Sequence, residues 1–147
     1  MATKITQNFS LEELYASSTA KAKKIDNTPT PEVKANLIKL CKEVLQPIRN
    51  KYGRAITITS GYRSPKLNAA VGGVKNSQHV LGQAADIKCT STSKAVLFNV
   101  IKSMIEKGEL KVGQLIWEYG TKQEPNWIHV SLPYSKTNQI LYLYSKK

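Results

Sequence analysis

Three residues of this chain have side chains that bind transition metals, and they lie in segments that a sheet could bring together. His79 and Asp86 occur in SQHVLGQAAD, and His129 occurs in WIHVS. The two histidines are the only ones in the chain. Two imidazoles and one carboxylate match the open ligand set of a catalytic zinc site, whereas calcium or magnesium would require more oxygen ligands. Spacing alone also allows each histidine to be an ordinary hydrogen-bonded residue of the sheet.

The surroundings of Asp86 favour a site. The aspartate lies within the apolar segment AADIK, where an unpaired carboxylate would be costly to bury, so we expect a positive group beside it. Gly82, Ala84 and Ala85 add little side-chain bulk nearby, as a site that needs close backbone approach would require. Strand alternation places His129 and Trp127 on the same face of WIHVSL.

The elements that must position these residues can be predicted from periodicity and capping signals. Ser10 and Glu13 form a capping box, Pro31 is suited to the first turn of a longer helix, and Pro47 should bend that helix. Helices are expected in residues 9–14, 31–53, 64–73 and 90–108, strands in residues 55–60, 84–89, 114–119, 127–132 and 139–144, and a polar connector in residues 17–31. Helices mostly precede strands and no βαβ alternation is present, which predicts an α+β fold with an antiparallel sheet and N-terminal helices.

Composition indicates one soluble domain spanning residues 1–147. The chain is 41% hydrophobic and 22% charged, and it lacks the apolar run of about 18 residues that a membrane span needs. The N-terminal residues do not resemble a secretory signal, so we expect synthesis in the cytoplasm. In that compartment Cys41 and Cys89 should be reduced, mainly structural thiols, although the sequence leaves open whether they ever pair.

The net charge of +12 predicts an anionic partner. Nucleic acid, an anionic membrane and the bacterial cell wall all fit this charge. However, no basic run exceeds two residues, and aromatic residues do not alternate with the lysines as in a platform that stacks single-stranded bases. We therefore expect no specific nucleic-acid binding.

Three motifs, in order, carry a family resemblance: SGYRSPKLNAAVGG, SQHVLGQAADI and QLIWEYG followed by WIHVS. Together they resemble the zinc-dependent M15 peptidases, which share a fold with the hedgehog signalling domain. These enzymes are D-alanyl-D-alanine carboxypeptidases and L-alanyl-D-glutamate endopeptidases of peptidoglycan stem peptides, including many phage endolysins. The similarity covers residues 5–131. The family pattern Ser-x-His-x-x-Gly-x-Ala-x-Asp is met at Ser77, His79, Gly82, Ala84 and Asp86.

The resemblance implies roles for individual residues. His79, Asp86 and His129 would hold one zinc ion. Arg63, in the SGYR turn, would bind a substrate carboxylate or polarise the scissile carbonyl, because its guanidinium offers a fork of donors. Trp127 would wall the substrate groove or pack in the core.

Ser77 would hydrogen-bond near the ligands and substrate, or cap the turn that contains it. Neither its position nor that of Trp127 decides between the alternatives.

The general base is where the sequence departs from the commonest family pattern. Many relatives carry an acid three residues before the last histidine, and here that position is Asn126. Glu118, at the end of QLIWE, resembles the hedgehog-type arrangement and is the favoured base, because a strand end is better ordered than a loop. Glu124, in the loop before Trp127, is the alternative.

The expected function is hydrolysis of stem-peptide bonds by zinc-activated water, with Glu118 as the base. Which of the two bonds is cut stays open. The alternative is a catalytically weak or inactive zinc-stabilised module that binds cell wall or protein. We expect a monomer that reaches the anionic wall after release through a holin or by lysis, if the chain is phage-derived.

Overall fold

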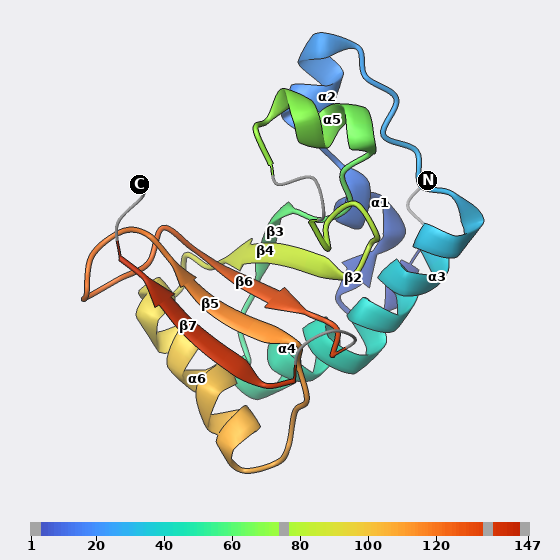
Figure 1. The fold of residues 1–147 in the computed structure, drawn as a ribbon. Coiled ribbons are helices and arrows are strands. Elements are labelled where there is room, and N and C mark those ends of the chain that lie inside the picture. The colour runs from blue at the N-terminus through green and yellow to red at the C-terminus, as the bar shows by residue number, and fades with distance from the viewer. Residues whose placement is uncertain (1–3, 74–76, 134–136, 145–147) are drawn as a thin grey trace.

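The computed structural model describes residues 4–73, 77–133 and 137–144, and it has the predicted α+β architecture (Figure 1). The helices are α1 Leu11–Tyr15, α2 Ser18–Lys23, α3 Pro31–Leu40, the π-helix η1 Cys41–Leu45, α4 Gln46–Tyr52, α5 Pro65–Ala70 and α6 Lys94–Glu106. The strands are β1 Lys4–Thr6, β2 Phe9–Ser10, β3 Thr57–Ser60, β4 Ala84–Lys88, β5 Gln114–Glu118, β6 Trp127–Ser131 and β7 Gln139–Leu143.

The central sheet has the strand order β3-β4-β6-β5-β7. Three of its pairings are antiparallel, but β7 pairs parallel to β5, so the sheet is mixed where the sequence predicted an antiparallel one. The reason is that both edges of β6 are taken, by β4 and β5. The next strand, β7, instead adds at the outer edge of β5, and it runs in the direction of β5 because it is antiparallel to β6.

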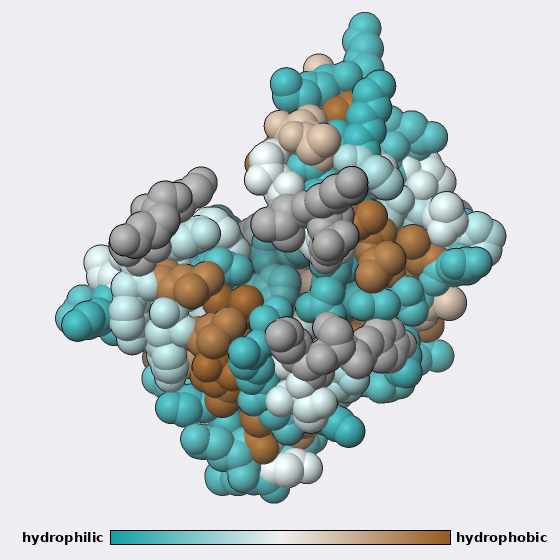
Figure 2. Space-filling view, viewed as in Figure 1, coloured by the Kyte–Doolittle hydropathy of each residue, from teal (hydrophilic) through white to brown (hydrophobic). Residues whose placement is uncertain are grey.

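The two faces of the sheet have different roles. Ile128 and Val130 of β6 are fully buried against a core that includes Phe98 and Ile101 of α6. His129 and Trp127 point to the opposite face, because successive strand residues alternate. In the space-filling view hydrophilic residues surround the hollow over β4 and β6, and hydrophobic residues gather over β5 and β7 (Figure 2).

The N-terminal helices form where their caps predict them. Ser10 and Glu13 make the reciprocal capping box of α1, and the Thr30 hydroxyl accepts a bond from Val33 N at the start of α3. Pro47 has no N–H, and the turn before it widens into η1, where Gln46 N bonds to Cys41 O.

One prediction in this region is wrong. The segment expected to be a polar connector contains the short helix α2, whose N-cap Ser17 accepts a bond from Ala20 N. The helix could not be predicted from hydrophobic periodicity, because only Ala20 of its residues is buried and the others are mostly polar.

The described residues include no helix with the length and apolarity that a membrane crossing requires. Cys41 and Cys89 are both free and buried. Burial raises the pKa of the Cys41 thiol to about 11, which keeps it protonated and unreactive. This agrees with the structural role expected for it.

Candidate active site

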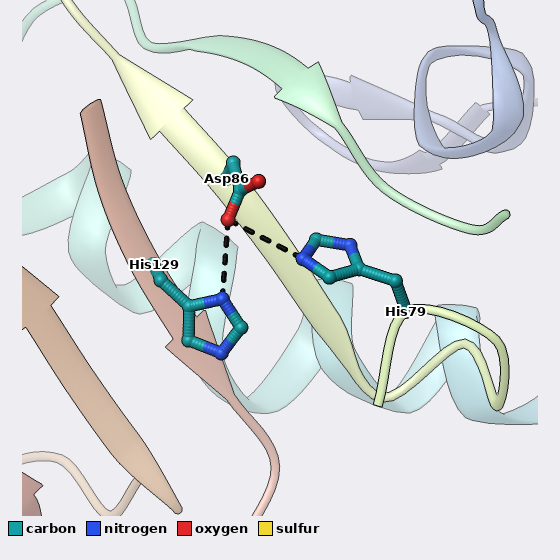
Figure 3. A group of neighbouring side chains, drawn as sticks. All are labelled: His79, Asp86 and His129. Atoms are coloured by element: carbon teal, nitrogen blue, oxygen red, sulfur yellow. Dashed lines mark hydrogen bonds and ion pairs between the residues drawn. The ribbon is translucent and has the colours of Figure 1, made fainter. Parts of the chain in front are cut away.

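The three candidate metal ligands meet at the centre of the sheet (Figure 3). Asp86 and His129 are directly opposite each other on the neighbouring strands β4 and β6, and His79 comes from the turn that precedes β4. One ligand atom from each residue lies within 4.8 Å of the others. The imidazole rings approach edge to face, with centroids 5.3 Å apart. Strand register thus joins Asp86 and His129, which are 43 positions apart in sequence.

The orientation of His79 is fixed by a backbone contact. Its Nδ1 lies 2.7 Å from the carbonyl oxygen of Gly61. A carbonyl can only accept a hydrogen bond, so Nδ1 must carry the proton, and the lone pair is left on Nε2. That Nε2 faces the other two ligands, 3.3 Å from Oδ1 of Asp86. A hydrogen bond from the second ring nitrogen is the usual support of a metal-binding histidine.

The contacts between Asp86 and the two histidine rings also suit the binding of a metal cation. Oδ1 of Asp86 lies 3.1 Å from Nδ1 of His129 as well as near His79. Burial raises the pKa of Asp86, but its contacts with the rings of His129 and His79 lower it by more, so the net pKa lies well below the usual value. A carboxylate that stays ionised beside an unprotonated Nε2 is a ready pair of donors for a metal ion.

His129 adds a further sign that the cluster is incomplete by itself. Its Nε2 is buried and has no hydrogen-bond partner among the described residues. Buried polar atoms are normally paired, so an orphaned atom at such a cluster points to a missing ion, water or ligand. The residues present therefore fit a metal ion, and two nitrogens with one oxygen suit zinc.

The small residues near the ligands serve packing more than clearance. Gly82 has φ +72°, and a Cβ there would lie 2.8 Å from Cγ1 of Val33 in α3. The close approach predicted from the sequence therefore exists, but it is to α3. Ala84 and Ala85 are fully buried within β4.

Arg63 is tied to the turn that carries the first ligand. Its backbone N–H donates to the His79 carbonyl at 3.0 Å, and its Nη2 lies 3.4 Å from the hydroxyl of Ser77. The same hydroxyl accepts from His79 N, at 3.1 Å. Ser77 therefore both caps its turn and contacts Arg63, so the two alternatives raised for it are not exclusive. Burial lowers the pKa of Arg63, whereas the charge of Asp86 raises it.

A second polar side chain, which sequence reasoning missed, holds the Arg63 loop in place. The side-chain nitrogen of Asn27 donates to the carbonyls of Tyr15 and Tyr62, at 2.7 and 3.0 Å. Its side-chain oxygen accepts from Ser64 N at 2.7 Å. Asn27 lies in residues 17–31, which were predicted to be a connector. No local sequence pattern predicts which backbone groups its side chain will contact.

The two candidate bases are placed differently. Glu118 lines the same hollow as the three ligands, and burial raises its pKa, with the charge of His129 opposing and that of Asp86 adding. Glu124 does not line this hollow. Its carboxylate accepts from the backbone N–H of Lys94, at 2.9 Å, and pairs with the Lys94 ammonium, at 3.1 Å. These contacts lower the pKa of Glu124 and tie it to the start of α6.

The hollow has a volume of about 430 Å³ and combines nearly all the residues singled out from the sequence. It is lined by the three candidate ligands together with Arg63, Ser77, Glu118 and Trp127. Tyr119 also lines it, although nothing in the sequence indicated this. Trp127 is partly buried, packs edge-on against Tyr119 and lines the hollow, which favours the groove-wall interpretation over a purely core one.

The fold and this cluster agree with the comparison to known families. The family model described as Peptidase M15 matches residues 7–131, which is most of the chain. The chain therefore belongs to the M15 peptidase family, and a metallopeptidase is the class that the fold and the His-Asp-His cluster define. No curated protein matches the chain significantly.

Proposed function

We propose that this protein is a zinc-dependent peptidase that hydrolyses peptide bonds in the stem peptides of bacterial peptidoglycan. The observation that carries the proposal is the convergence of His79, Asp86 and His129 in one hollow with Glu118 and Arg63. A structural zinc site would be closed by four protein ligands, whereas three ligands beside an acid and an arginine suit catalysis.

A zinc ion held by the three ligands would lower the pKa of water to about 7 and polarise the scissile carbonyl. Glu118 accepts the proton of the attacking water and passes it to the leaving amine. The partly buried carboxylate has a raised pKa, which brings it closer to the range in which a base can also return its proton as an acid. Arg63 donates hydrogen bonds to the substrate, and its buried Nε has no partner among the described residues.

Two features support a wall substrate. The net charge of +12 favours adsorption to an anionic polymer. The resemblance of the sequence motifs to M15 peptidases of stem peptides points to the same substrate. Both a D-alanyl-D-alanine bond and an L-alanyl-D-glutamate bond are compatible with the site. The proposal includes action as a monomer on the wall after release from the cytoplasm.

A second candidate is a zinc-stabilised binding module that does not cut. The observation in its favour is Asn126, which replaces the acid that many relatives carry three residues before the last histidine. The position of Glu118 in the hollow weighs against it, because that carboxylate can do the work of the missing acid.

Digestion of purified peptidoglycan, followed by mass spectrometry of the released fragments, separates the two candidates. We expect zinc-loaded protein to release fragments cut at one type of bond, and the mass of each fragment identifies that bond. Glu118→Gln should release the same fragments about 10²-fold or more slowly. If zinc-loaded wild-type protein releases no fragment, the enzyme proposal is wrong and the binding module stands.

A further inference from the structure

The end of β5 has an unusual backbone. Tyr119 has φ +57°, in the left-handed region that L-residues rarely adopt. Among the described residues only Lys24 and Asn138 share this feature without being glycine. Asparagine tolerates this conformation, and Lys24 is a helix C-cap, where it is common. Tyr119 is the one aromatic residue of the three.

This backbone conformation changes where the tyrosine side chain lies. Glu118 is the last residue of β5 and lines the hollow. Strand alternation would send the next side chain to the opposite, core-facing side of the sheet. Tyr119 nevertheless lines the same hollow as Glu118. The positive φ is what brings two consecutive side chains to one side.

The tyrosine ring is then fixed by a second aromatic side chain. It meets Trp127 edge-on, with centroids 5.4 Å apart and planes at 76°. Trp127 is the register partner of Glu118 on β6, so the two rings and the carboxylate are neighbours. The backbone N–H of Tyr119 bonds to the Leu143 carbonyl, and the following Gly120, at φ +74°, completes the turn.

The turn itself does not need a tyrosine. Glycine or asparagine would adopt this backbone with less strain, and strain of this kind persists where function uses it. Nor is the ring part of the core, because Tyr119 is only partly buried and lines the hollow. We therefore infer that the Tyr119 ring serves to contact whatever binds in the hollow.

We propose that Tyr119 is a substrate-positioning residue, whose ring forms with Trp127 an aromatic wall for the alanine on the acyl side of the scissile bond. This inference rests on the proposed function. Both candidate bonds, D-alanyl-D-alanine and L-alanyl-D-glutamate, carry alanine on that side, and its methyl group can pack against an aromatic ring. Contact between this methyl group and the two rings holds the scissile carbonyl beside Glu118 and the metal ligands.

The test uses three zinc-loaded proteins and matched substrates. The proteins are wild type, Tyr119→Gly and, as the control, Lys24→Gly, which relieves the same kind of strain outside the residues that line the hollow. The substrates are a synthetic stem peptide and versions in which either acyl-side alanine is replaced by glycine. The measurements are kcat/KM, zinc content and thermal unfolding.

We expect wild type and Lys24→Gly to cut the alanine peptide about tenfold better than the glycine peptide, the effect of one methyl in a packed site. In Tyr119→Gly this preference should shrink to less than about threefold, with full zinc content. Its thermal midpoint should stay close to that of wild type, since relieved strain offsets the lost ring contact. If Tyr119→Gly keeps the preference for alanine, or loses activity only together with folding or zinc, the inference is wrong while the proposed function stands.

If wild type cuts no peptide, the proposed function fails and calorimetric binding of the same peptides decides the inference. Tighter binding of the alanine peptide by wild type, lost in Tyr119→Gly, would still support the aromatic wall. Equal binding of all the peptides, or none, would overturn it.

Discussion

Replacing His129 by alanine should remove most of the stabilisation that zinc gives to this fold. Three donor atoms within 4.8 Å form the site, and ligands that are already placed bind the metal in the folded chain only. At free zinc about 1,000-fold above Kd, binding stabilises the fold by about 4 kcal/mol. For a chain of this length that raises the thermal midpoint by roughly 12 °C.

The variant lacks one of three ligands, and its affinity should fall by more than the 10- to 100-fold that loss of an outer contact costs. At the same zinc concentration, a loss of about 100-fold leaves about 1.4 kcal/mol, which is a shift of roughly 4 °C. Glu118→Gln is the matched control, because Glu118 lines the hollow without belonging to the ligand cluster, and it should keep the full shift.

The assay is thermal unfolding of chelator-treated protein, with and without zinc, and with magnesium as a second control. Magnesium should give no comparable shift, because it prefers a larger set of oxygen ligands. Equal zinc shifts in wild type and His129→Ala would refute the ligand assignment. So would the absence of any zinc shift in wild type.

Further predictions concern the base, the arginine and the loop. Glu118→Gln should lower kcat by about 10²-fold or more, whereas Glu124→Gln should stay near wild type; similar losses in both would contradict the choice of base. In metal-free protein burial raises the folded pKa of Glu118, so its contribution to stability is present below its unfolded pKa and lost as pH rises through the folded value. Measurements of unfolding free energy should therefore show Glu118→Gln gaining on wild type as pH rises from the ordinary glutamate pKa to the raised folded pKa, and a constant difference would argue against a buried carboxylate. Arg63→Lys should lower kcat/KM by roughly 10- to 100-fold, since lysine lacks the fork of donors, and a kinetic comparison with unchanged kcat/KM would exclude a direct role. Asn27→Ala should destabilise the fold by roughly 3 kcal/mol in denaturant unfolding, because three backbone groups lose their partner; a loss under about 0.5 kcal/mol would mean that water replaces it.

Local signals in the sequence predicted most elements within a few residues. The capping box at Ser10 and the Thr30-Pro31 start depend on neighbours in the chain, so they were readable without the fold. The helix α2 was missed because its stability comes from packing one small residue, Ala20. The parallel pairing of β7 was missed because it depends on which strand edges are already occupied.

The residues of the candidate site differed in how well the sequence could predict them. His79, Asp86 and His129 could be chosen because few side chains bind metals and the family motifs contain them. The choice between Glu118 and Glu124 could not be made so firmly, since both acids lie near the last ligand in sequence. The two acids differ in their contacts, because Glu124 is bound by Lys94, and this contact depends on where α6 begins.

By itself, the sequence determined the residue types of the cluster, the order of most of the elements and the faces of the strands, because alternation and capping are local properties. Only the tertiary structure decided which residues share the hollow. Strand register places Asp86 opposite His129, and a positive φ turns Tyr119 to the side of Glu118. Both arise from pairing and backbone geometry across distant segments, which residue types alone do not specify.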